Sequence, residues 1–203
     1  QGQTAMAAPL TAPPDAPPAA KPAILPLALK NAPSSAAVSA PADAPALAPT
    51  AFATGTLIIP MDVISQNVGM WKAYGLDYRL LSNGIRVSWA IADNKNYNGI
   101  DFSASVRDLR TNVPISTSYT YRGGPFIIDA ADAPAARTLI TAWWAANANQ
   151  PSVHVANAAG GFTANVPVTL IRAPKIAQEG VNAGISITYY NAAGIPDSAG
   201  NVW

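Results

Sequence analysis

The chain has 203 residues and a formal net charge of +1, and only 11% of its residues are charged. It carries no Lys/Arg cluster of the kind that binds nucleic acid, and no cysteine, which excludes disulfides, thiolate metal sites and a cysteine nucleophile. No apolar run reaches the length of a membrane span, so we expect none. A surface rich in Asn, Ser, Thr and Ala is common in secreted bacterial proteins, and a secreted chain freed of its signal would begin as this one does, at Gln1. We therefore expect a secreted, extracellular or cell-surface protein.

Residues 1–53 form a Pro/Ala-rich arm that holds more than half of the chain's 19 prolines. Proline fixes φ and lacks an N–H donor, so we expect an extended, polyproline-II-like segment. Its composition alone is typical of a flexible linker. Because such a segment has too little apolar surface to fold by itself, it must pack on its own domain or on a neighbouring chain, and we expect the neighbouring chain. Its best docking anchors are Ile24, Leu25, Leu27 and Leu29.

The predicted domain, residues 54–203, opens with a strand–helix–strand unit. Residues 57–59 are an apolar run typical of a strand buried on both faces. Ser65 or Asn67 can cap a helix that ends at Gly84, and residues 86–91 form the next strand. This pattern predicts two parallel strands joined by a crossover helix.

An irregular stretch follows, with a turn-rich loop at 93–99, a short strand at 101–105 and a helical turn at 106–110. Asp132 and Pro134 then predict the start of a second long helix. We expect one of its two adjacent tryptophans, Trp143 and Trp144, to face the core and the other to lie at the core's edge.

The remaining apolar runs predict further strands at 125–129, 153–155 and 166–171, the last at an edge because it contains Pro167. Residues 185–193 fit a helix closed by Gly194, or an alternating strand. Together the elements predict an α/β fold with an open, mostly parallel sheet and helices on both faces. Its neighbouring parallel strands would be 57–59, 87–91, 126–128 and 153–155.

Ligands of such sheets bind beyond the carboxyl ends of the strands. The polar residues that follow those ends are Asp62, Gln66, Asp129 and Asn157. Two carboxylates there can act as an acid/base pair or bind a cation, although each Asp can equally cap the following helix. We expect the capping role, with no catalytic residue, no metal and no cofactor.

His154 is the only histidine, so it cannot form a two-histidine metal site. Its place within a predicted strand indicates a hydrogen-bonded structural role, with a general base as the alternative. The pairs Gly123-Gly124 and Gly160-Gly161 match no phosphate-binding loop and are typical of turns.

Five segments carry a resemblance to large exported surface proteins of myxobacteria and related bacteria, some of them labelled as gliding-motility proteins. They are LIIPMD, GMWKAYGLDYRLL, GIRVSWAI, GGPFIID and AAGIPDS. The opening also resembles the flavodoxin-like layout of class I glutamine amidotransferases, but this chain lacks the cysteine that performs amidotransfer. The resemblance implies a surface or extracellular setting and supplies no active site.

These observations favour a non-catalytic extracellular structural or assembly subunit. Its arm would dock on copies of itself or on other exported proteins of a polymer or surface complex. Two alternatives stay open: a secreted module that binds a carbohydrate or small ligand, and a hydrolase with an acidic dyad.

Overall fold

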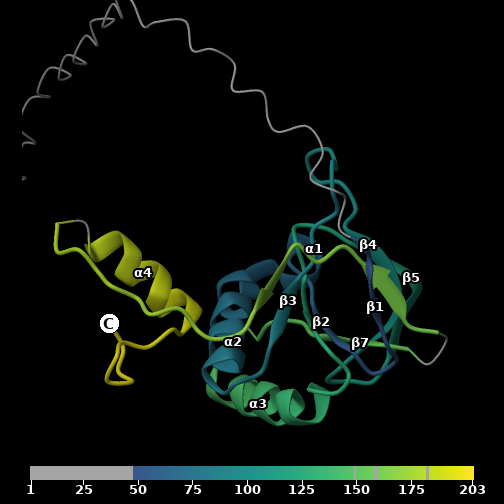
Figure 1. Cartoon of the computed structure of the whole chain (residues 1–203). Coiled ribbons are helices and arrows are strands. Elements are labelled where there is room, and N and C mark those ends of the chain that lie inside the picture. The colour runs from purple at the N-terminus through teal and green to yellow at the C-terminus, as the bar shows by residue number, and fades with distance from the viewer. Residues whose placement is uncertain (1–47, 149, 158–159, 182) are drawn as a thin grey trace, which may run out of the picture. The chain divides into compact units, whose positions relative to one another are not determined.

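A seven-stranded antiparallel sheet forms the centre of the chain. The computed structural model describes residues 48–203, except 149, 158–159 and 182 (Figure 1). The strand order is β5-β4-β7-β2-β6-β3-β9, and every neighbouring pair is antiparallel. The strands are β2 (Leu57–Ile59), β3 (Val87–Trp89), β4 (Phe102–Asp108), β5 (Pro114–Tyr121), β6 (Phe126–Ile128), β7 (His154–Ala156) and β9 (Val168–Leu170).

The predicted parallel sheet is therefore wrong, although the four predicted core strands are indeed neighbours. In the chain, β2 and β3 precede and follow α2 (Met70–Ser82), and they run in the same direction. In the sheet, however, β6 lies between them and is antiparallel to both. β6 and β7 likewise run in the same direction, and β2 is inserted between them. The order β7-β2-β6-β3 is that of two interleaved split βαβ units, the ferredoxin-like arrangement.

Alternate residues of each core strand pack into two separate hydrophobic clusters, one on each face of the sheet. Leu57 and Ile59 belong to the cluster shared with α2 and with α3 (Ala133–Ala146). Ile58 faces the opposite side, which is covered by the two-stranded sheet of β1 (Thr50–Phe52) and β8 (Phe162–Ala164). The prediction of helices on both faces is thus also wrong, since α2 and α3 both pack against one face (Figure 1).

The first crossover begins with the four-residue helix α1 (Val63–Gln66) and the 3₁₀ turn η1 (Asn67–Gly69). Asp62 caps α1, since its Oδ1 accepts a hydrogen bond of 2.8 Å from the Ser65 amide. The predicted glycine stop of α2 is confirmed: Gly84 has φ +78°, and the Ile85 amide donates to the Leu80 carbonyl at 3.1 Å.

The chain between β3 and β6 differs from the prediction. Residues 106–110 were expected to form a helical turn, but residues 106–108 belong to β4, which pairs with β5 in a hairpin. The alternation of Ile115, Thr117, Tyr119 and Tyr121 along β5 is the signal of a strand with two different faces. The hairpin joins the sheet beside β7 and makes β5 an edge strand.

The C-terminal part of the chain forms the helix α4 (Ala183–Ala193), which packs on α2. Of the two structures that residues 185–193 fit, the helix is confirmed, and Gly194 follows it with φ +77°. Gly75 of α2 permits the close approach, because a Cβ at that position would lie 1.8 Å from the Ala193 carbonyl oxygen.

The arm anchors Ile24, Leu25, Leu27 and Leu29 lie outside the described residues, so their docking stays a prediction. β1 begins at Thr50, within the segment that the sequence assigns to the arm. Across the part of the chain that the structure describes, no helix combines the length and the apolar character needed to cross a bilayer.

Candidate functional site

The four polar residues predicted to share one site lie at opposite ends of the sheet. Ile59 pairs with Phe126, so the end of β2, with Asp62 and Gln66 beyond it, lies beside the beginning of β6. Asp129 follows the other end of β6, where Ile128 pairs with Leu57. Asn157 follows β7 at this second end, since Val155 also pairs with Leu57. The antiparallel order therefore separates residues that a parallel sheet would have brought together.

Gln66 is a buried clamp between the first crossover and the loop before β7. Its Nε2 donates to the carbonyl oxygens of Pro60 at 2.6 Å and Ser152 at 3.0 Å, and its Oε1 accepts from the Ser152 amide at 2.9 Å. Both N–H groups and the carbonyl oxygen of the Gln66 amide thus have partners within the fold.

Asp129 and Asn157 also make local contacts. The exposed Asp129 accepts a hydrogen bond of 2.9 Å from the Ala131 amide. Asn157 donates to Ser105 Oγ at 3.1 Å and accepts from Arg107 Nη1 at 3.1 Å. Together with the Asp62 cap, these contacts show turn, cap and strand-end roles.

His154 is buried against the tyrosines of β5. Its Nδ1 and the Tyr121 hydroxyl form a hydrogen bond of 2.8 Å, and the Tyr119 ring meets its ring edge-on at 5.1 Å between centroids. Burial lowers the pKa of His154 to about 4, so the ring is neutral at pH 7. Burial likewise raises the pKa of Tyr121, which stays protonated.

The hydroxyl–carboxylate pair of Ser65 and Asp62 does not complete a catalytic triad with this histidine. Ser65 Oγ hydrogen-bonds to the Tyr119 hydroxyl and donates to Asp62 Oδ2 at 3.3 Å. The hydrogen bond of His154 goes to Tyr121 and not to Ser65. Among residues 48–203, as far as they are described, no three His, Asp or Glu side chains come together as metal ligands.

Four large aromatic side chains form a row at the surface, which we call the aromatic surface. Its members are 37–49% exposed despite their size. They come from α2, β3 and α4 and rest in part on Phe126 of β6. They are Trp71, Tyr74, Trp89 and Tyr189.

The rings form a connected chain of contacts. Trp71 stacks on Tyr189 with 4.8 Å between centroids and lies 6.4 Å from Tyr74. Tyr74 meets Phe126 edge-on at 6.2 Å, and Trp89 stacks on Phe126 at 6.0 Å. The row therefore runs from α4 across the first turns of α2 to the end of β3.

Helical and strand geometry explain this arrangement. Trp71 and Tyr74 are three residues apart and so share a face of α2, whereas the buried stripe of that helix includes Ala73, Leu76 and Leu80. Trp89 lies directly opposite Phe126 in the β3–β6 ladder, so both side chains leave the sheet on the same face.

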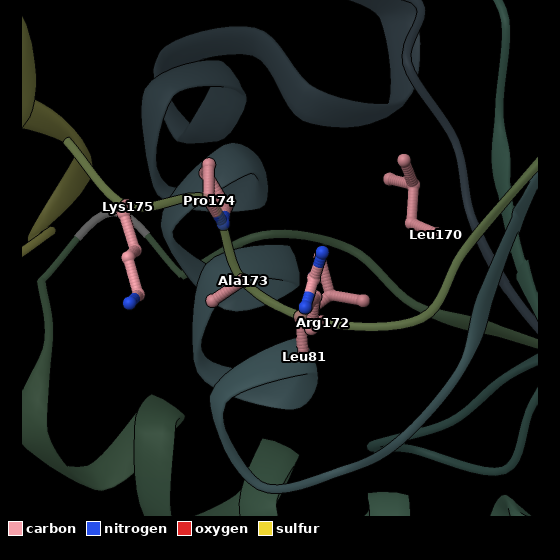
Figure 2. A pocket seen from close by; sticks show the side chains of 6 residues that line it. All are labelled: Leu81, Leu170, Arg172, Ala173, Pro174 and Lys175. Carbon is pink, nitrogen blue, oxygen red and sulfur yellow. The ribbon is translucent and has the colours of Figure 1, made fainter.

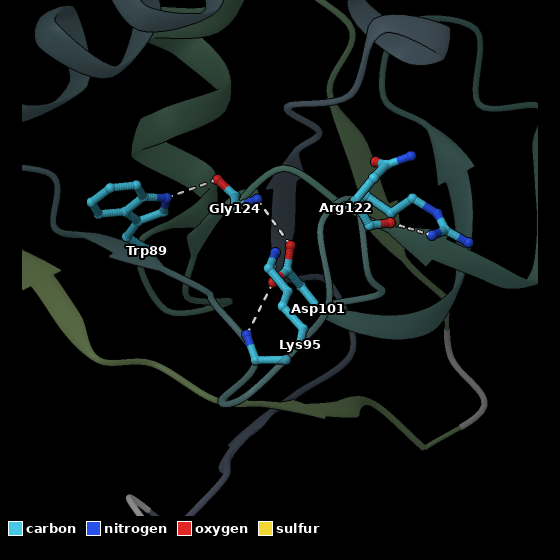
Figure 3. A network of polar contacts seen from close by, with 7 residues as sticks. Trp89, Lys95, Asp101, Arg122 and Gly124 are labelled. Carbon is cyan, nitrogen blue, oxygen red and sulfur yellow. Dashed lines mark hydrogen bonds and ion pairs between the residues drawn. The ribbon is translucent and has the colours of Figure 1, made fainter.

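A network of polar contacts fixes the orientation of Trp89 (Figure 3). Its Nε1 donates to the Gly124 carbonyl at 2.9 Å, and the Gly124 amide donates to Asp101 Oδ2 at 2.9 Å. The fully buried Asp101 carboxylate also accepts from the Ala92 amide at 3.0 Å and pairs with Lys95. These charge-assisted bonds tie the loop after β3 to the turn before β6 and hold the indole between them.

The sequence pattern did not reveal this surface. In the sequence, Trp71, Gly75 and Tyr78 fit a helical period as well as Ala73, Leu76 and Leu80 do, so the spacing alone does not distinguish the exposed stripe from the buried one. The adjacent tryptophans Trp143 and Trp144 lie as predicted, one in the core and one at its edge. Trp144 is buried and donates to the Pro151 carbonyl at 2.9 Å, and Trp143 packs at the edge of the core.

A cavity of about 640 Å³ lies between α2 and the segment after β9 (Figure 2). Its lining carries no carboxylate, imidazole or hydroxyl group, and its ionisable side chains are those of Arg172 and Lys175. The lining residues are Leu81, Leu170, Arg172, Ala173, Pro174 and Lys175.

Asp77 of α2 is the one buried carboxyl whose two oxygens both lack a partner among the described residues. Burial raises the pKa of Asp77 well above its usual range. Nothing in its contacts assigns it a substrate.

In comparisons with known proteins, no protein-family model, no curated protein and no solved structure matches this chain. The resemblance to exported surface proteins therefore stays a prediction.

Proposed function

We propose that this chain is a non-catalytic subunit of an extracellular assembly, and that its aromatic surface is the contact between neighbouring copies. The observation that carries the proposal is the row of Trp71, Tyr74, Trp89 and Tyr189 at the surface. Large, connected and exposed apolar groups of this kind are typical of interaction sites.

The composition of the row suits a protein interface. Tryptophan and tyrosine supply most of the binding energy at many interfaces, because each buries a large area with few rotatable bonds. The hydrogen bond from Trp89 to Gly124 holds one of these rings in place before binding. An ordered side chain loses little entropy when a partner arrives, so this contact favours association.

The catalytic alternative has less support. The predicted acidic pair, Asp62 and Asp129, lies at opposite ends of the sheet, so the two carboxylates cannot flank one substrate. His154 is neutral and bonded to Tyr121 inside the fold. We therefore keep the proposal of a subunit without catalytic residues.

The carbohydrate alternative has partial support from the exposed rings. A sugar stacks on an aromatic face, and here Tyr189 covers one face of Trp71 and Phe126 one face of Trp89, so each ring keeps at most one face for a ligand. A protein partner uses ring edges as well as faces, so the geometry favours a protein.

Oxidative footprinting of the full chain tests the proposal. The protein is exposed to hydroxyl radicals at a concentration where it is dispersed and at one where it is assembled, and tryptophan oxidation is measured by mass spectrometry. We expect Trp71 and Trp89 to be protected at least fivefold on assembly, while Trp144, which is buried in the fold, is unchanged. Equal oxidation of Trp71 and Trp89 in both samples would contradict the proposal.

A further inference from the structure

The aromatic surface combines ring faces with free hydrogen-bond donors. Within the described part of the chain, no hydrogen bond is made by the indole N–H of Trp71 or by the hydroxyls of Tyr74 and Tyr189. Flat rings beside hydrogen-bond donors that have no partner within the fold are the features with which aromatic-lined sites bind proline-rich segments. The rings contact the prolines, and the donors bond to backbone carbonyls that a polyproline II helix leaves without internal partners.

The same chain carries a segment of matching chemistry. Residues 1–47, which lie before the described part, contain ten of the 19 prolines. Pro14 and Pro17 are three residues apart, which is one turn of a polyproline II helix, so their rings would share one face. Two further prolines, Pro22 and Pro26, flank the apolar group Ile24-Leu25.

The charges of the segment also favour binding through its prolines and apolar side chains. Residues 1–47 contain two aspartates and two lysines, Asp15, Asp43, Lys21 and Lys30, so their net charge is zero. A neutral segment gains little from electrostatic attraction, so we expect its binding to come from its prolines, its apolar side chains and its backbone carbonyls.

We propose that the occupant of the aromatic surface is the proline-rich arm, residues 1–47, of a second copy of this chain. The inference rests on the proposed function and names the partner segment of the same site. Each copy then has both a donor segment and an acceptor surface. A head-to-tail contact of this kind joins any number of copies into a ring or a polymer.

Photo-crosslinking with isotopically mixed copies tests the inference on the full chain. Tyr74 is replaced by p-benzoylphenylalanine, an aromatic residue that suits the same exposed position, in ¹⁵N-labelled protein. This protein is mixed with an excess of unlabelled wild type, irradiated and digested. The matched control carries the crosslinker at Ile115 of β5, the edge strand at the other end of the sheet from β3.

We expect crosslinks from position 74 to unlabelled peptides of residues 1–47, and at least tenfold fewer from position 115. Crosslinks to unlabelled peptides of residues 48–203 would overturn this inference but leave the assembly proposal standing, because the surface would then pack on the folded part of another copy. Crosslinks only to labelled peptides of residues 1–47 would place the arm on its own chain and overturn the inference as well.

A second variant separates proline recognition from simple apolar contact. Replacing all ten prolines of residues 1–47 by alanine keeps Ile24, Leu25, Leu27 and Leu29 but removes the preference for an extended helix. We expect the association of copies to weaken at least tenfold. Unchanged association in this variant would overturn the inference, because a proline-specific site cannot bind the alanine arm equally well.

Discussion

Trp89 and Gly124 are joined by a hydrogen bond from the indole Nε1 to the glycine carbonyl, 2.9 Å long, across the junction of β3 and β6. The contact requires glycine, because Gly124 has φ +74° and a Cβ there would lie 2.5 Å from the same indole nitrogen. The buried Asp101 holds the Gly124 amide from the other side. A core contact thus determines the orientation of a surface tryptophan.

Substitution of Gly124 by alanine should therefore weaken both folding and assembly. Left-handed backbone conformation alone costs a non-glycine residue about 1–3 kcal/mol, and the clash with Trp89 adds to it. The matched control is Gly84→Ala, since Gly84 has φ +78° but a Cβ there would meet no packed neighbour within 4 Å. We expect denaturant unfolding to show a larger loss for Gly124→Ala, and only this variant to lose association. Equal losses of stability would show that the indole does not depend on Gly124.

Gly75 should be equally intolerant, for a different reason. Its backbone is helical, so alanine would improve helix propensity, but the new Cβ would lie 1.8 Å from the Ala193 carbonyl of α4. We expect Gly75→Ala to displace α4 and to lower the free energy of unfolding by about 1–3 kcal/mol. The stack of Trp71 on Tyr189 should be lost, seen as a changed near-ultraviolet circular dichroism spectrum. A stabilised protein with an unchanged spectrum would contradict the packing of α4 on α2.

His154 should make the fold sensitive to acid. Its pKa is about 4 in the fold and 6.5 in the unfolded chain, so the unfolded chain binds more protons between these values. Stability is therefore complete above pH 6.5 and falls as the pH is lowered towards 4, by about 3 kcal/mol in all. Because the chain has a single histidine, its NMR titration is unambiguous. A midpoint near 6.5 in the folded protein would contradict its burial against Tyr121.

Asp77 should change the pH dependence of stability in the opposite direction to His154. Its pKa is raised in the fold, so the folded chain binds more protons than the unfolded chain above pH 4, and stability declines as the pH rises through this region. The decline is at most about 1.4 kcal/mol per pH unit. We expect Asp77→Asn to remove it and to be more stable than the wild type at pH 7. The measurement is the free energy of unfolding from pH 4 to 8, where parallel curves for the two proteins would refute the role of Asp77.

Sequence patterns predicted the core strands and the long helices but not the direction of the strands. The runs Leu57–Ile59 and Phe126–Ile128 are apolar on both faces, and such runs suit a buried strand of either direction. The strand–helix–strand pattern correctly implies that β2 and β3 run the same way. It does not reveal that β6, more than 30 residues later in the chain, is inserted between them.

The predicted site of Asp62 and Asp129 depended on the direction of the strands. Asp62 and Asp129 each follow a core strand, and only a parallel pair of strands would bring them together. The aromatic surface depends on contacts between α2, α4 and β6 that no local pattern encodes. Trp71 and Leu76 are both apolar and both helical, and the packing of the sheet decides which of them is buried.

The mass of the full chain in solution, measured by sedimentation over a range of concentrations, tests the central claim most directly. Truncation of an aromatic anchor at an interface costs about 2 kcal/mol or more. The double variant Trp71→Ala, Trp89→Ala should therefore associate at least a hundredfold more weakly than the wild type. The control Ile115→Ala removes an exposed apolar side chain from the opposite edge of the sheet and should change the association less than twofold. If the double variant, still folded by circular dichroism, assembled as the wild type does, the aromatic surface would not be the contact between copies.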